Sequence, residues 1–286
     1  MTLTVRRVGR TKEVLMGVPF DHIASSYDSS FTRTPIGQLQ RKQVWSYLEK
    51  ITTQLPGLDI LELNCGTGED AVLFSERGFN IVATDVSEEM LKVTQEKVQQ
   101  YSMQHKISSH YLDLDSFDDT LFEKKFDLVF SNFGGLNCIN PESLKKLFDK
   151  IPAVLAPEGR FVAVIMPKFC LWESIYFFLK FQFKNIFRRW TKKSVDALLP
   201  NGQVRTWYYS PSQVKSWAPK FFAIRSKPIG LALPPSYLQN FFSKHRRFLA
   251  RLNNLEKRLN TWSLLSGMAD HYLIDLKLKP GKSSSH

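Results

Sequence analysis

The sequence predicts an α/β fold with a doubly wound sheet that is mostly parallel and has an antiparallel final strand. Three observations predict it. Short apolar runs of strand length alternate with segments of helical periodicity. The first run, residues 60–63, breaks at a glycine-rich loop, and the alternation continues to residue 167. The 286 residues, 43% of them hydrophobic, suffice for one domain of this kind with additional helices. We expect a single domain over residues 18–279.

The chain is organised around residues 58–87. A buried strand at 60–63 ends in the loop Asn64-Cys65-Gly66-Thr67-Gly68, where small residues permit a sharp turn and close approach to a ligand. A helix follows, and a second strand over 80–84 ends at Asp85. Such a unit places a nucleoside over the loop and its ribose hydroxyls on the acid.

Two kinds of cofactor fit this loop. Gly66 and Gly68, with Ala71, also match the dinucleotide fingerprint of a dehydrogenase. Glu62 favours S-adenosylmethionine, because a carboxylate beside the loop repels a pyrophosphate and attracts a sulfonium and an ammonium. An ordinary turn that binds nothing is the third alternative. The unit resembles motif I of the class I S-adenosylmethionine-dependent methyltransferases, with Asn64 in place of the first glycine. Asn tolerates left-handed backbone, so this departure is mild.

The remaining core elements resemble the small-molecule members of that family (methyltransferase domains 11 and 25). We predict a helix at 87–101, strands at 107–112, 126–132 and 160–166, a helix at 141–155 broken or kinked at Pro152, and a turn at 156–159. The stretch FDLVFSN, residues 126–132, resembles motif IV, whose following loop lies beside the transferred methyl. It lacks the proline–aromatic pair of amino-methylating enzymes. The resemblance covers residues 20–167 well and the rest loosely, and implies a cofactor-binding core over 57–167.

A cap precedes this core over residues 18–56. Residues 20–28 read FDHIASSYD, which resembles the family's cap signature, and a helical pattern follows at 35–55. The resemblance implies that Tyr27 reaches the methionyl end of the cofactor or closes over the donor methyl; a buried aromatic that only fixes the cap is the alternative. His22 is a candidate base near the acceptor, although a surface histidine is the commoner case.

The resemblance implies a set of cofactor contacts from four strand ends and the cap. Asp85 would accept the ribose hydroxyls, and Asp113 would face the adenine amino group, with the adjacent Asp115 an alternative. Cys65 is interpreted as a small loop filler. The residues that we expect at the cofactor are Tyr27, Glu62, Asn64, Cys65, Gly66, Gly68, Asp85, Val86, Met90, Leu112, Asp113, Asn132, Phe133 and Gly134.

The sequence shows no acid–base constellation, so catalytic residues stay open, with Tyr27, His22 and His271 as candidates. Methyl transfer from a sulfonium needs in-line placement, a dry pocket and, for some acceptors, a base. The three cysteines show no metal-ligand spacing, and we expect no metal.

The net charge of +12 is concentrated in two segments. Residues 168–193 hold seven Lys/Arg and one Glu, and residues 236–262 hold six Lys/Arg and one Glu, so together they carry +11. We predict amphipathic helices at 169–190 and 237–262 that form a lid over the carboxyl ends of the strands. Aromatic residues within 169–183 would then line an acceptor pocket; packing on the flank of the fold is the alternative. A final strand, residues 269–279, is expected at the sheet edge.

The two chain ends are predicted to be unstructured. We expect a flexible tail at 1–17 and a disordered tail at 280–286. No stretch of 18 uncharged apolar residues occurs, and the N-terminal segment lacks the features of a secretion signal. The sequence is therefore expected to be that of a cytoplasmic protein.

Taken together, the residues predict methyl transfer from S-adenosylmethionine to oxygen or carbon of a lipophilic, anionic small molecule or a carrier-bound acyl group. Aromatic area suits an apolar body, and lysine and arginine attract an anion. Basic amphipathic helices also suit a peripheral contact with a membrane surface. The alternatives are an RNA methyltransferase and a non-catalytic cofactor-binding module. Nucleic acid is disfavoured because the aromatic residues are expected to be needed for packing.

Overall fold

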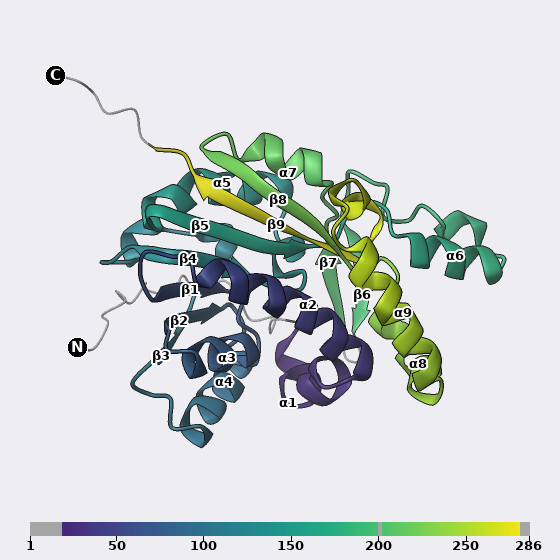
Figure 1. The fold of residues 1–286 in the computed structure, drawn as a ribbon, viewed down its shortest axis with the longest axis horizontal. Coiled ribbons are helices and arrows are strands. Elements are labelled where there is room, and N and C mark those ends of the chain that lie inside the picture. The colour runs from purple at the N-terminus through teal and green to yellow at the C-terminus, as the bar shows by residue number, and fades with distance from the viewer. Residues whose placement is uncertain (1–18, 200–201, 281–286) are drawn as a thin grey trace.

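The computed structural model describes residues 19–199 and 202–280. The tail expected at 1–17, and all but the first residue of the one expected at 280–286, lie outside the described residues. The described strands form a seven-stranded sheet flanked by helices, and a separate two-stranded hairpin (Figure 1). The order in the large sheet is β3-β2-β1-β4-β5-β9-β8. Its strands are β1 (Asp59–Leu63), β2 (Asn80–Asp85), β3 (Ile107–Tyr111), β4 (Phe126–Ser131), β5 (Leu155–Ile165), β8 (Phe221–Ile229) and β9 (His271–Leu278).

Strands β1 to β5 are parallel, as the alternating pattern predicted. In the centre, Glu62 of β1 lies opposite Ala83 of β2 on one side and Phe130 of β4 on the other. The strands on either side of the Gly loop therefore end together, which brings the loops after β1, β2 and β4 to one place. This is the crevice in which open α/β sheets bind ligands.

The final strand is antiparallel, as expected, but its expected place at the sheet edge is wrong. β9 pairs with β5 on one side and β8 on the other, both antiparallel, so β8 is the edge. The alternation in residues 271–278 suggested one solvated face. Instead the inward polar residue Asp275 is fully buried and is paired with Arg160 and Tyr47. The polar residue that suggested a solvent-facing edge strand, Asp275, is therefore part of a buried ion pair.

The core helices begin at capping residues that the sequence displays. The Thr34 hydroxyl accepts from the Gly37 N–H, the Ser87 hydroxyl from the Met90 N–H, and Asn140 caps the helix that follows it. β5 begins at Leu155, so the expected turn at 156–159 is an irregular part of that strand, where the register with β4 shifts. The helices around the core are α1 (Ala24–Tyr27), α2 (Pro35–Thr52), α3 (Glu69–Glu76), α4 (Glu88–Gln100), α5 (Pro141–Val154) and α7 (Pro211–Trp217).

The two predicted lid helices are shorter than expected. The first, α6 (Leu171–Leu179), ends early, and the chain turns back through Phe181 with φ 56°. The second is divided at His245 into α8 (Gln239–Lys244) and α9 (Arg246–Leu259). The pattern did not predict the hairpin of β6 (Val195–Leu199) and β7 (Gly202–Thr206).

These additions lie at one end of the sheet. Figure 1 shows α1, α6, α8 and α9 at the carboxyl ends of the parallel strands, with α6 at the periphery. The lid over a bound cofactor and its alternative, packing on the flank of the fold, both stay predictions. Among the described helices, none has the length and apolar character needed to cross a bilayer.

Candidate active site at the carboxyl ends of the strands

The loop after β1 has the backbone that the glycine pattern predicted. Asn64, Gly66 and Gly68 have φ of 50°, 55° and 73°. The Asn64 side chain holds the neighbouring loop after β4: its amide donates to the Asn132 carbonyl (3.2 Å), and its oxygen accepts from the Ser131 hydroxyl (2.7 Å). A Cβ added to Gly66 would meet no atom within 4 Å, so this side of the loop is open.

Two predicted acids, Asp85 and Glu62, border the loop and differ in their hydrogen-bond partners. Asp85 accepts the Gly66 N–H (2.8 Å) and the Ser87 N–H (2.9 Å), and burial raises the pKa of its carboxyl. Glu62 is 2% exposed, and its Oε2 has no hydrogen-bond partner among the described residues. Burial, and then the negative charge of Asp70, raise the pKa of Glu62 well above its usual value.

Asp70 joins the cap to this crevice, a role that sequence reasoning missed. It accepts from the Arg41 guanidinium (2.7 Å), the Trp45 indole N–H (2.5 Å) and the Asn132 amide (2.8 Å), and it is 3% exposed. The sequence indicated only an acid in the first turn of a helix. The available signal was Arg41 and Trp45, four residues apart and therefore on one face of α2.

The cap signature is tied to the cofactor loop by its two acids. Asp28 accepts from the Thr67 hydroxyl (2.7 Å) and pairs with Lys97 (2.6 Å). Burial opposes its ionisation, but the hydrogen bonds from Lys97 and Thr67 lower the pKa of Asp28 below its usual value. Asp21 accepts from the Ser87 hydroxyl (2.5 Å) at the start of α4. The cap therefore lies over the loops after β1 and β2.

Of the two catalytic candidates in the cap, one lies in the crevice and one does not. Tyr27 is partly buried, with its ring centroid 5.4 Å from that of Phe31, and it packs with Met90. Burial raises the pKa of Tyr27 to about 12, and the charges of Arg41 and Asp85 act on its hydroxyl. This hydroxyl therefore stays protonated. His22 is exposed on the surface, which is the commoner position for a histidine and the alternative to a catalytic role.

The other predicted contacts lie in the loop after β1 and just after the ends of β2 and β3. The Leu112 N–H donates to the Asp85 carbonyl (3.0 Å), while the Asp113 carboxylate accepts from the Asp115 N–H (2.9 Å). Val86 follows Asp85 and is partly exposed. Cys65 is buried in the core, and burial raises the pKa of its thiol well above the usual value, which agrees with its interpretation as a filler.

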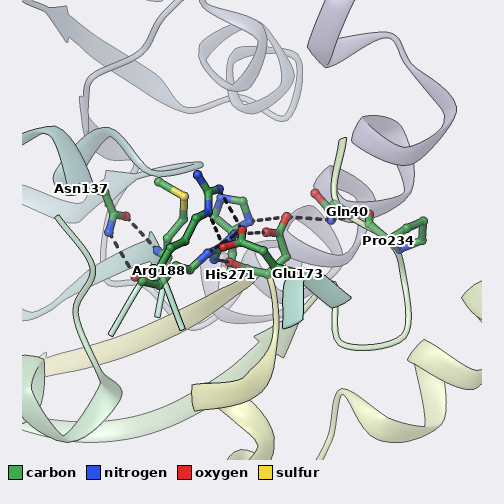
Figure 2. Close-up of polar contacts among 9 residues, drawn as sticks. Gln40, Asn137, Glu173, Arg188, Pro234 and His271 are labelled. Carbon is green, nitrogen blue, oxygen red and sulfur yellow. Dashed lines mark hydrogen bonds and ion pairs between the residues drawn. The ribbon is translucent and has the colours of Figure 1, made fainter. Parts of the chain in front are cut away.

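A second polar cluster lies beside the first and was not predicted. Figure 2 shows side chains from α2, α6 and the start of β9 converging on it. Arg189 pairs with Glu173 (2.9 Å) and with Asp270 (3.0 Å), and Arg188 adds a second pair to Glu173 (2.6 Å). Gln40 of α2 donates to Asp270 (3.4 Å). To make these pairs the chain must fold back after α6, which explains why the predicted helix at 169–190 ends early.

His271 connects this second cluster to the loop after β4. Its Nδ1 lies 3.2 Å from Asp270 Oδ2, and its Nε2 lies 3.9 Å from the place that a Cβ on Gly134 would occupy. The ring also meets the edge of Phe133, with centroids 5.4 Å apart. Burial opposes ionisation of Asp270, but His271 and Arg189 together hold the pKa of its carboxyl well below the usual range. Nδ1 is therefore within ion-pair distance of a carboxylate, although it has no hydrogen-bond partner of regular geometry among the described residues, and the other ring nitrogen lies near the loop after β4.

Two cavities lie among the added helices, and neither is lined by the residues expected at the cofactor. An apolar one of about 360 Å³ lies between α6 and α9, next to the second cluster. Of the stretch 169–183, Leu171, Trp172 and Ile175 line it, and Trp172 is the one aromatic residue among them, so the expectation that the aromatic residues of this stretch line a pocket does not hold for this cavity. The larger, about 710 Å³, lies over the α8–α9 junction and is lined mostly by basic residues. The lining of the apolar cavity between α6 and α9 includes Trp172, Ile175, Leu231, Leu252, Leu255 and Met268.

Comparison with known proteins agrees with this geometry. A family described as a methyltransferase domain matches residues 60–159, which span β1 to the middle of β5. Residues 60–159 are therefore similar to a methyltransferase domain, in agreement with the resemblance to class I S-adenosylmethionine-dependent methyltransferases. A demethylmenaquinone methyltransferase of Clavibacter sepedonicus is 31% identical over 144 residues, which are 50% of this chain and 54% of that protein. The chain spans about half the length of most of the curated relatives that it matches.

Solved structures show the same fold beyond the methyltransferase domain proper. The CcbJ methyltransferase of Streptomyces caelestis has a TM-score of 0.58 at 14% identity and covers 90% of this chain and 96% of its own. The magnesium protoporphyrin IX methyltransferase of Synechocystis PCC 6803, solved with bound S-adenosylhomocysteine, has a TM-score of 0.54 at 13% identity, with 85% of each chain covered. At these identities the likeness concerns the fold alone.

Proposed function

We propose that this methyltransferase transfers a methyl group from S-adenosylmethionine to oxygen or carbon of a lipophilic, anionic small molecule or carrier-bound acyl group. The observation that carries the proposal is the juxtaposition of three features at one end of the sheet. They are the loop after β4, the Asp270–His271 pair that faces it, and an apolar cavity beside that pair. A cavity lined by apolar side chains with a few convergent polar groups is the usual form of a small-molecule site.

The residues of the first cluster fit the cofactor. The unpartnered, buried Glu62 oxygen suits an ammonium or sulfonium group, and the open side of Gly66 leaves room for a ligand close to the backbone. Asp85 would hold the ribose hydroxyls with the acceptor capacity that Gly66 and Ser87 leave free. When bound, S-adenosylmethionine supplies an electrophilic methyl group. The cap, held by Asp28, would exclude water from it.

His271 has the position of a general base. Its Nε2 would accept a proton from an acceptor hydroxyl or an acidic carbon, while Asp270 would stabilise the imidazolium that forms. Tyr27, whose hydroxyl stays protonated, would act as a hydrogen-bond donor and not as a base. The names of two similar proteins denote small-molecule acceptors, demethylmenaquinone and magnesium protoporphyrin IX, and thus support an acceptor of this class.

The proposal that the acceptor is anionic rests on basic side chains that form no ion pair with an acid among the described residues. Arg188 and Arg189 are paired with Glu173 and Asp270, so they carry little net attraction. The larger cavity, in contrast, has Lys244, Arg246, Arg247 and Arg251 in its lining and no acidic residue. An anionic group on the acceptor, or an acidic carrier, would be drawn to this junction.

An RNA methyltransferase is the second candidate, and one observation favours it. Aromatic residues expected to be used in packing are in fact exposed beside lysines, as at Phe181 and Lys180. Exposed aromatic rings with basic neighbours can stack on bases. The apolar cavity favours the lipophilic acceptor over RNA, because its lining offers no side-chain hydrogen bonds for a base edge.

The experiment that tests the acceptor class is incubation of the protein with radiolabelled cofactor and a cell extract, followed by partition of the product. We expect label in the organic phase or on a small acidic protein. Label in nuclease-sensitive material would overturn the proposal in favour of RNA. Binding of S-adenosylhomocysteine without labelled product from any extract fraction would indicate the non-catalytic module.

A further inference from the structure

Helix α6 has its polarity reversed with respect to solvent. Of its nine described residues, Glu173 alone is buried, while Phe178 and Leu179 are 59% and 68% exposed. A surface helix normally buries its apolar stripe and exposes its acids. Here the acid is held inside by Arg188 and Arg189, and the apolar side chains are left outside.

The exposed apolar surface continues past the end of the helix. Phe181 contacts Phe183, which contacts Phe178, and Phe187 contacts Trp190, so the rings form clusters rather than isolated contacts. Contiguous exposed apolar area of this kind marks an interaction site in soluble proteins. We call it the aromatic surface. Its members, each between 56% and 81% exposed, are Phe178, Leu179, Phe181, Phe183, Phe187 and Trp190.

Four exposed lysines, at positions 180, 184, 192 and 193, alternate with these apolar residues. No Asp or Glu occurs between residues 174 and 195, so no acid nearby in the sequence offsets their charge. The aromatic surface therefore combines exposed apolar side chains with positive charge. This combination is complementary to the interface of an anionic bilayer, where aromatic rings enter the headgroup region and lysines remain among the phosphates.

The aromatic surface also adjoins the apolar cavity. Ile175 is 44% exposed on the outer side of α6 and at the same time lines the cavity, together with Trp172. Trp172 precedes Glu173, whose partner Arg189 binds Asp270 next to His271. The cavity is thus lined by residues that adjoin the aromatic surface, at Ile175, and the second polar cluster, at Trp172.

We propose that residues 175–193 dock this protein on an anionic membrane surface and receive the lipophilic acceptor from it. The docking part rests on the structure of α6 and its continuation; the delivery part rests on the proposed function. A second copy of the chain fits less well, because a two-fold contact through this surface would bring eight lysines together. RNA fits less well because Leu179 and Ile175 cannot stack on bases and the adjoining cavity is apolar.

The test is co-sedimentation of the full chain with vesicles. We would compare vesicles of phosphatidylcholine alone with vesicles that contain about 30% phosphatidylglycerol, at low and high salt. We expect binding only to the anionic vesicles, and weaker binding at high salt. The variant Leu179→Gln/Phe181→Gln should bind about tenfold more weakly, since it removes two exposed apolar side chains from the interface.

The matched control is Leu58→Gln/Phe222→Gln, a pair of similarly exposed apolar residues at the opposite end of the sheet. It should bind vesicles like the unmodified chain, and both variants should retain S-adenosylhomocysteine binding as proof of folding. Failure of the unmodified chain to bind anionic vesicles would overturn the proposal, as would equal binding by the Leu179→Gln/Phe181→Gln variant. So would self-association or RNA binding that this variant abolishes while vesicle binding is absent. Because the assay contains no methyl acceptor, its result is independent of the labelled-product experiment.

Discussion

At the scale of single residues, the site separates two tasks between two carboxylate-centred clusters. Glu62, Asp70 and Asp85 surround the glycine-rich loop, where positive charge would be bound. Asp270 instead lies between the Arg189 guanidinium and the His271 imidazole, which hold the pKa of its carboxyl well below the usual range against the effect of burial. Burial raises the pKa values of Glu62 and Asp85, so a cationic ligand would stabilise their ionised forms, while Asp270 is already paired with Arg189. We propose that its role is to orient the His271 imidazole.

The first prediction at this scale concerns His271. His271→Ala should lower kcat about 10²- to 10⁴-fold, the usual contribution of a positioned base, with little change in S-adenosylhomocysteine affinity. Added imidazole should restore part of the rate, which a merely structural role would not allow. The control is His105→Ala, an exposed histidine after α4. Unchanged kcat in the His271 variant would exclude the base and favour an acceptor that reacts as a preformed anion.

At the scale of elements, the cap depends on side chains that the sequence did not identify as partners. The resemblance predicted that residues 20–28 lie near the cofactor, but not that Asp28 would be held by Thr67 of the glycine-rich loop and Lys97 of α4. Contacts of this kind join residues about 40 and 70 positions apart. No local pattern encodes them, because each partner has an adequate local explanation as a cap, a turn residue or a surface charge.

The prediction at this scale is that the cap and the cofactor are coupled through Asp28. Asp28→Ala removes a charged hydrogen bond and should weaken S-adenosylhomocysteine binding by about 1.5 kcal/mol, roughly tenfold. Hydrogen exchange across residues 20–52 should become faster in the bound state. Asp118→Ala is the matched control, since among the described residues the Asp118 carboxylate accepts from Thr120 alone, in its own exposed turn. Calorimetry on the two variants would measure the effect, and equal affinities would show that the cap is not part of the cofactor site.

At the scale of the whole molecule, the parallel core could be predicted from the sequence. For the helices after β5, the sequence predicted the approximate location but not the lengths or the burial. Apolar runs, glycines and caps fixed the ends of β1, β2 and β4 within a residue or two because these signals are local. For the segment after β5, the predicted burial of the aromatic residues was wrong, and the reason is physical. Its aromatic residues have helical spacing, which normally indicates burial, but here the stripe faces solvent and Glu173 is the buried group. Hydrophobic periodicity records which residues share a face, not what that face contacts.

The final prediction uses the stability of the whole fold to decide between the two cofactors that the glycine-rich loop admits. A ligand that binds only the folded chain stabilises it by RT ln(1 + [L]/Kd), about 2.7 kcal/mol at a concentration of 100 Kd. For a domain of this size we expect S-adenosylhomocysteine to raise the melting temperature by about 5–10 °C. NAD should leave it unchanged, because the buried Glu62 carboxylate repels a pyrophosphate. Glu62→Gln should reduce the shift by removing the partner of the ammonium group. A shift with NAD and none with S-adenosylhomocysteine would contradict the assignment of Glu62, whatever the outcome of the vesicle and acceptor experiments.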